Sequence, residues 1–167
     1  GSNIDVRNNS FSITGSSATA GGNFWAYYTP ATTLTGSILN YNDLYAAGTN
    51  VTNNVGRFNG ANSATLAAWQ TATGQDANSI SADPSYNSAS NLVPQLGSPL
   101  VAAATPLAGV TTDITGFTRS VTTPTIGAYE QAGDAAGPAI TYTPLTFTCA
   151  TGDRALNGVT ITDASGV

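Results

Sequence analysis

The chain has 167 residues, of which 41% are apolar but only 8% are charged. A typical soluble domain has a similar apolar share and about 25% charged residues, so this chain can build a core and is not an intrinsically disordered segment. A net charge of −5 with only four basic residues argues against nucleic acid as a partner, because phosphate binding needs Lys and Arg. Direct membrane insertion is not expected either, because no apolar run approaches the roughly 20 residues of a membrane span.

Residues 3–14 predict a bent strand. Apolar residues alternate with polar ones on both sides of Asn8-Asn9, and Asn tolerates the left-handed backbone of a sharp corner. Residues 36–48 show a similar pattern about 33 residues later, within the roughly 20–45 residues of solenoid repeats, although two such segments do not establish a repeat. The chain also has no Lys and a single Glu but abundant Thr, Ser, Asn and Gly, which favours a mostly β fold.

Four aromatic residues lie within residues 24–28. One interpretation is a strand packed under a loop, because aromatic side chains supply much of the buried area in a fold with few large aliphatic residues. The other is a platform on which glycans stack. For that alternative the candidate contacts are Trp25, Tyr27 and Tyr28.

One helix is predicted, over residues 62–74. Asn62 or Ser63 can cap its start, Leu66 and Trp69 lie on one face, and Gly74 can end it. We expect a short helix on a β-rich body to cover an apolar opening.

Residues 76–86, 92–109 and 113–130 predict an irregular cap, because Pro locks φ and withholds an N–H donor from a central strand. Three oxygen-bearing side chains in one loop, Asp76, Asn78 and Asp83, make calcium the ion to consider, although Asp-x-Asn also forms Asx turns. No other cofactor is expected, since the chain has no His and a single Cys.

Charge is concentrated in residues 113–130, which contain Asp113, Arg119 and Glu130. The structural interpretation is a clasp, in which a bidentate Arg–carboxylate pairing fixes two loop segments. The alternative is catalysis, but glycoside hydrolysis needs two close carboxylates and lyase chemistry needs a base beside a cation. Without His, Lys or an Asp-Asp pair, the sequence predicts no catalytic residue and no enzyme.

The composition changes after Gln131. Residues 132–138 are small or are Gly and Pro, as in a linker, and residues 139–167 alternate as the strands of a β-sandwich do. The predicted organisation is a first domain over 1–131, a linker over 132–138 and the incomplete start of a second domain over 139–167. Cys149 is expected to be a small buried apolar residue or to pair outside this chain.

Several motifs resemble the C-terminal end of right-handed parallel β-helix surface proteins secreted by Bacteroidetes and related bacteria. The resemblance covers most of residues 36–130. It departs at Thr125, where that family commonly has Asp. Its motifs are the helix with Leu66 and Trp69, the segments 78–84 and 97–99, and the set Asp113, Gly116, Arg119, Pro124, Gly127 and Glu130.

The resemblance implies an all-β fold: terminal coils and cap of a parallel β-helix with one short helix, followed by the first strands of an Ig-like sandwich. It also implies an extracellular or cell-surface location. The expected function is a non-catalytic structural or adhesive module of a large surface or secreted protein, with assembly into a homo-oligomeric filament as one version of it. The alternative is a polysaccharide-degrading or glycan-binding β-helix module, with cell-surface glycans as partners.

Overall fold

A computed structural model describes residues 3–131, 139–141 and 159–162. The chain forms two compact units, 1–133 and 134–167. The predicted linker, residues 132–138, lies outside the described residues, as do Cys149 and the rest of the predicted second domain apart from its two short strands.

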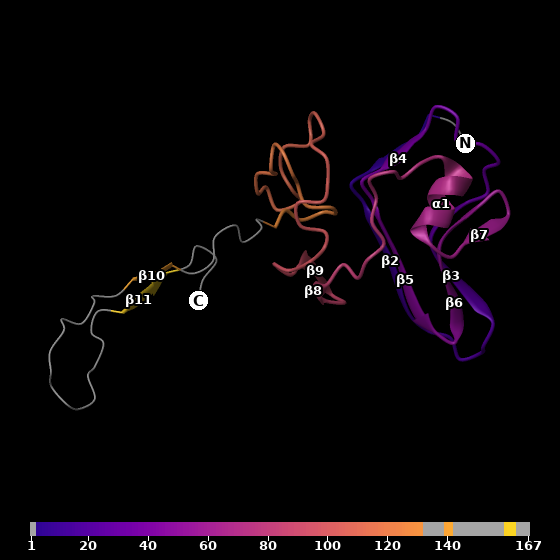
Figure 1. Cartoon of the computed structure of the whole chain (residues 1–167), viewed down its shortest axis with the longest axis horizontal. Helices are drawn as coiled ribbons and strands as arrows, with labels where there is room; N and C mark the ends of the chain where they lie inside the picture. The colour runs from indigo at the N-terminus through magenta and orange to yellow at the C-terminus, as the bar shows by residue number, and fades with distance from the viewer. Residues whose placement is uncertain (1–2, 132–138, 142–158, 163–167) are drawn as a thin grey trace, which may run out of the picture. The chain divides into compact units, whose positions relative to one another are not determined.

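The described fold is mostly β with one short helix, as the composition predicts (Figure 1). Its strands form several small sheets, not one large one. In chain order the elements are β1 (Asp5–Arg7), β2 (Ser10–Ser16), β3 (Gly22–Thr29), β4 (Ile38–Asn40), β5 (Asp43–Thr49), β6 (Val51–Phe58), β7 (Ala61–Ser63), α1 (Leu66–Thr73), β8 (Tyr86–Ser88), β9 (Asn91–Pro94), β10 (Ala139–Thr141) and β11 (Thr160–Thr162).

The first three strands pair in parallel with the next three. Strand β1 pairs with β4 and β2 with β5 in one constant register, in which Asp5 lies opposite Ile38 and Ser10 opposite Asp43. Strand β3 pairs with β6 across a smaller separation along the chain, because residues 17–21 connect β2 to β3, whereas Asn50 alone connects β5 to β6. The repeat that the sequence indicates is therefore a stacking of two successive turns of chain.

The corners of the two turns repeat as well. Left-handed backbone occurs at Asn8 (φ 61°) and, at the corresponding place in the next turn, at Tyr41 (φ 54°). The predicted Asn corner of the first turn is confirmed, and the second turn has its corner at a different residue type. There Asn42 instead points inward and is buried, so the left-handed conformation falls on Tyr41.

Buried Asn42, in the second turn, is hydrogen-bonded both to the first turn and to residues 76–79. Its side-chain Oδ1 accepts the Asn9 backbone N–H (3.0 Å), and its own backbone N–H donates to Ser79 Oγ (2.8 Å). Its Nδ2 donates to Val6 O (2.9 Å) and to Asp76 Oδ1 (3.0 Å). Because every polar atom of this buried amide is paired, the polar interior costs little stability.

Helix α1 is shorter than predicted. Its N-cap is Thr65, whose hydroxyl accepts the Ala68 N–H, and Gly74 ends it with φ 65° as expected. Asn62 and Ser63, the predicted caps, lie in β7 and pair with β6, because strand pairing competes with helix formation for the same backbone groups. Leu66 and Trp69 both pack against the core of the stacked turns.

The first unit has two hydrophobic clusters. One lies between the stacked turns and α1 and has as its buried members Leu34, Leu39, Leu44, Val55 and Trp69. The other lies among the irregular loops after β7 and comprises Leu100, Ala104 and Ile126. The second cluster is the core of the cap, the name used here for residues 82–131.

The cap has little regular structure, as its Pro content predicts. Strands β8 and β9 form a two-stranded antiparallel sheet, and Pro94 stands at the end of β9. The cap is joined to the first turn at Asn8, whose amide donates to Thr105 O (2.7 Å) and accepts from Thr105 N (3.1 Å). Asn8 O also accepts the Gly127 N–H (2.8 Å).

In the second unit, β10 and β11 pair in antiparallel fashion, with Ile140 opposite Ile161. This is the only regular structure in the described residues of that unit.

Candidate functional site

The structure brings Asp113, Arg119 and Glu130 together in the cap. Asp113 Oδ1 accepts from the backbone N–H groups of Thr115 (2.7 Å) and Phe117 (2.9 Å), and Oδ2 accepts the Glu130 N–H (2.9 Å). Burial alone would raise the pKa of this carboxyl. The hydrogen bonds from Glu130, the Thr115 hydroxyl and the two other backbone groups outweigh burial and lower the pKa to about 2.

Arg119 does not form the expected bidentate pair. Its Nη1 lies 3.4 Å from Glu130 Oε2 and donates to Thr125 O at 3.0 Å, while Nη2 donates to Gly127 O at 2.6 Å. The guanidinium therefore uses its donors mainly on two backbone carbonyls of the same loop. It fixes that loop to the segment from which it projects.

Glu130 fixes the same loop through the backbone of Ser120 and Thr125. Its Oε1 accepts the Ser120 N–H (3.1 Å) and its Oε2 accepts the Thr125 N–H (3.1 Å). Thr125, where the resemblance departs from its family, is fully buried and its hydroxyl exchanges two hydrogen bonds with the Gln131 backbone. In this position Thr supplies contacts of its own between the loop and Gln131 at the end of the cap.

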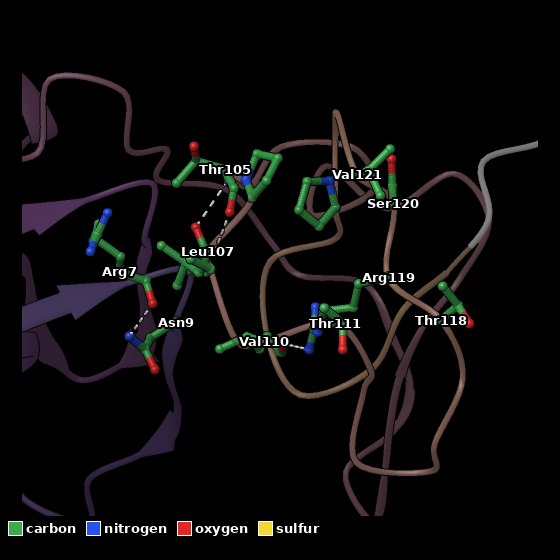
Figure 2. A pocket seen from close by; sticks show the side chains of 15 residues that line it. Arg7, Asn9, Thr105, Leu107, Val110, Thr111, Thr118, Arg119, Ser120 and Val121 are labelled. Carbon is green, nitrogen blue, oxygen red and sulfur yellow. Dashed lines mark hydrogen bonds between the residues drawn. The ribbon is translucent and has the colours of Figure 1, made fainter.

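A cavity of about 620 Å³ lies between the first turn and the cap (Figure 2). Arg7, Asn8 and Asn9 line it from the first turn, and the cap contributes mostly apolar residues, among them Leu107 and Val121. Arg7 forms an exposed ion pair with Asp5, and Arg119 is held by the loop that it fastens. The cavity is thus an apolar space in which both charged lining groups already have a carboxylate partner.

The aromatic segment divides into an inner and an outer part. Tyr27 packs edge-on against Phe11 (ring centroids 5.3 Å apart) and Trp69 (5.8 Å), so it belongs to the core. Trp25 and Tyr28 instead lie near each other at the surface, with ring centroids 6.0 Å apart. The packing interpretation is therefore confirmed for Tyr27, whereas Trp25 and Tyr28 form an aromatic pair that faces outward.

Two polar residues complete this outer surface. The Arg57 guanidinium lies over the Trp25 ring, 5.5 Å from its centroid, and Trp25 Nε1 donates to Asn62 Oδ1 at 3.0 Å. Arg57 pairs in register with Tyr28 on β3 and with Asn62 on β7. We call Trp25, Tyr28, Arg57 and Asn62 the aromatic–arginine surface.

Of the three side chains considered for calcium, Asp76 and Asp83 accept hydrogen bonds within the protein, and Asn78 is exposed. Asp76 is fully buried, and its carboxylate accepts from Asn42, from Ser79 Oγ (2.6 Å) and from Trp69 Nε1 (2.7 Å). Asp83 Oδ1 accepts the Ser85 N–H in a local turn. In the part of the chain that the structure describes, no cluster of three or more His, Cys, Asp or Glu could hold a metal.

Asp43 is a second buried carboxylate. It is fully buried in β5, where Oδ1 accepts the Ala82 N–H (3.1 Å) and Oδ2 accepts from Ser10 Oγ (3.1 Å). Burial raises its pKa to about 6, because the two hydrogen bonds only partly offset the loss of hydration and the charge of Asp83 adds to the rise.

The sequence did not predict that Arg57 and Asn62 lie beside Trp25, or that Asn8 joins the first turn to the cap. Arg57 is isolated in the sequence, and only pairing across β3, β6 and β7 brings it to the aromatic residues. Strict alternation would put Trp25 on the side of Tyr27. The structure packs both Ala26 and Tyr27 against the core, so alternation fails locally and Trp25 joins Tyr28.

Comparisons with protein-family models, with curated proteins and with solved structures found no match for this chain. Among the described residues, none of the helical structure is long and apolar enough to cross a membrane.

Proposed function

We propose that the first unit is the terminal, non-catalytic structural module of a right-handed parallel β-helix in a large surface or secreted protein. The observation that carries the proposal is the in-register parallel stacking of two turns, with the same register over β1·β4 and β2·β5. Solenoids stack one turn on the next, so each turn presents its edge to a neighbour.

The two edges of the stacked turns differ in a way that supports a terminal position. On one side, residues 76–81 hydrogen-bond to the second turn: Ile80 N–H donates to Asn42 O, and Leu44 N–H to Ile80 O. On the other side, β1, β2 and β3 each pair with one strand only, within residues 3–131. An unpaired parallel edge of this kind is a template for a further turn or a second copy.

The clasp supports a structural role for the charged residues. The oxygens of Asp113 and Glu130 are engaged by backbone N–H groups and by Arg119, so they hold loops together. General acid–base catalysis needs a group that can exchange a proton with a substrate, and a carboxyl with a pKa near 2 is a poor base.

The second unit is proposed to begin an Ig-like β-sandwich. Support comes from the antiparallel pairing of β10 with β11, the strand arrangement that sandwiches use. The resemblance of the sequence motifs to secreted β-helix surface proteins also supports the proposal of an extracellular location.

The proposal is tested by adding one turn to the open edge. A second copy of residues 3–35, inserted before Asn3, should stack on β1–β3, because the register of Asp5 with Ile38 and of Ser10 with Asp43 makes this segment one full turn. Hydrogen exchange measured by mass spectrometry should then show protected amides in the inserted copy and slower exchange in β2. The matched control is an insert of the same composition in shuffled order.

An inserted turn that exchanges as fast as the shuffled insert would contradict the β-helix. The enzyme alternative is tested separately: release of oligosaccharides from polygalacturonate, alginate or xylan by the purified chain would show that the module is catalytic.

A further inference from the structure

The aromatic–arginine surface has the composition of a carbohydrate site, and it is independent of the clasp and the cavity. Its members come from three adjacent strands: Trp25 and Tyr28 from β3, Arg57 from β6 and Asn62 from β7. Because Tyr28, Arg57 and Asn62 are successive partners across β3, β6 and β7, their side chains share one face of this sheet.

The aromatic pair offers a ring that is open to solvent. Tyr28 is 58% exposed, although the chain buries Trp69 completely and packs Tyr27 against it. A large exposed aromatic residue beside a second aromatic ring provides an apolar face with a polar tip, which suits the C–H face of a pyranose ring.

Polar groups surround this face. The Asn62 amide is exposed, and its Nδ2 lies 3.4 Å from Asn23 Oδ1, so amide donors and acceptors line one side of the aromatic pair. Amide side chains can donate to and accept from sugar hydroxyls at the same time.

Arg57 indicates which class of sugar this surface would bind. Of the ion pairs within residues 3–131, one joins Arg7 to Asp5 and the other joins Arg119 to Glu130, and Arg57 takes part in neither. Its guanidinium is held over Trp25, and the residue remains partly exposed beside Tyr28. A guanidinium presents a planar fork of donors that matches a carboxylate.

We propose that the aromatic–arginine surface binds a carboxylated sugar, with its ring on Tyr28, beside Trp25, and its carboxylate on Arg57. The net charge of −5 opposes the approach of a polyanion, so binding depends on these local contacts and not on long-range attraction. This site goes beyond the structural role proposed above and does not require it, since the residues that form it lie on β3, β6 and β7 alone.

Binding is measured by titration calorimetry with the whole chain and defined oligosaccharides. The carboxylated probes are oligogalacturonate, hyaluronate oligomers and sialyllactose, which distinguish uronates from sialic acid as the source of the carboxylate. Neutral galacto-oligosaccharides and dextran sulfate serve as comparison probes. We expect at least one carboxylated probe to bind and the neutral probe to bind about tenfold more weakly or not at all.

Two variants and two matched controls locate the site. Tyr28→Ala and Arg57→Gln should each weaken binding about tenfold or more. Phe117→Ala removes an equally exposed aromatic residue (57%) from the cap, and Arg7→Gln removes an exposed arginine elsewhere, so both should bind as the unchanged chain does. If Arg57→Gln folds poorly, Arg57→Lys keeps the charge and loses the fork, and should bind more weakly.

Four results would overturn the proposal. They are no binding of any carboxylated probe, equal binding of dextran sulfate, unchanged binding after Arg57→Gln, and equal losses in the two control variants. The β-helix proposal is unaffected by these results, because the inserted-turn experiment measures hydrogen exchange and not ligand binding.

Discussion

At the scale of single residues, this protein buries several polar side chains beside its hydrophobic clusters and pairs each of them. Asn42, Asp43, Asp76 and Thr125 are almost completely buried, and each is hydrogen-bonded. A buried polar group is costly when it is unpaired, so the arrangement is stable only while every partner is in place. Single substitutions within it should therefore have large effects.

The buried Asp43 predicts an unusual pH dependence. Because its pKa rises from 3.8 unfolded to about 6 folded, the folded state favours the protonated form. The free energy of unfolding should fall as pH rises from 4 to 6, by about 3 kcal/mol at most. Asp43→Asn mimics the protonated carboxyl toward Ser10 and Ala82, so it should flatten this dependence in urea unfolding measured at several pH values.

Asp113 should show the opposite pH dependence, and it serves as the control for Asp43. Its folded pKa is lowered to about 2, so its contribution to stability is present above pH 4 and is lost as pH falls from 4 to 2. Asp113→Asn should lower stability at pH 5 and leave the slope between pH 4 and 6 unchanged. A slope that survives in Asp43→Asn would mean that another group causes it.

At the scale of elements, the sequence predicts which strands exist better than it predicts where an element begins or ends. Alternation about the Asn8 corner predicts β1 and β2, and the loose repeat at 36–48 predicts β4 and β5. The start of the helix was misplaced, because Asn62 and Ser63 can serve as caps or as strand partners. Only the proximity of β6 makes them strand residues.

The contact between β6 and α1 depends on a glycine. A Cβ at Gly56 would lie 2.5 Å from the Trp69 ring and 3.0 Å from Tyr27 O. Gly56→Ala should therefore displace the helix and lower the free energy of unfolding by about 1–3 kcal/mol, as overpacking does. The change can be measured by urea unfolding followed by Trp fluorescence.

Gly97→Ala is the matched control for Gly56→Ala. A Cβ at Gly97 meets no atom within 4 Å, so the substitution should leave stability nearly unchanged. Equal stability of both variants would contradict the close packing of β6 against α1.

At the scale of the first unit, two hydrophobic clusters are held by polar connections. The cluster between the turns and the cluster in the cap have different buried members, and Asn8 joins the first turn to Thr105 and Gly127 of the cap. The cap has little regular structure, so side-chain hydrogen bonds replace strand pairing in fixing its loops.

Arg119→Ala tests this dependence on the clasp. The variant loses the hydrogen bonds to Thr125 O and Gly127 O and leaves the buried Glu130 without its cation. We expect a loss of about 2–4 kcal/mol, seen as a lower Tm by calorimetry. Arg7→Ala, which breaks an exposed pair, should change stability by less than about 1 kcal/mol.

The clasp interpretation would be wrong if Arg119→Ala kept its Tm while a binding or cleavage activity disappeared. That outcome would place Arg119 in a ligand site, next to the cavity that it lines.

The sequence by itself determined the mostly β character, the Asn corner of the first turn, the loops rich in Pro and the residues of the clasp, and it indicated the repeat only as a loose similarity of two segments. These follow from local properties: propensity, alternation, the restrictions of Pro and the scarcity of charge. Tertiary structure alone decided that Arg57 lies beside Trp25 and Tyr28, that Asp76 serves Trp69 and Asn42, and that Arg119 binds carbonyls more closely than carboxylate. Those contacts join residues from different strands and loops, and their partners are fixed by strand register and packing, which no local pattern encodes.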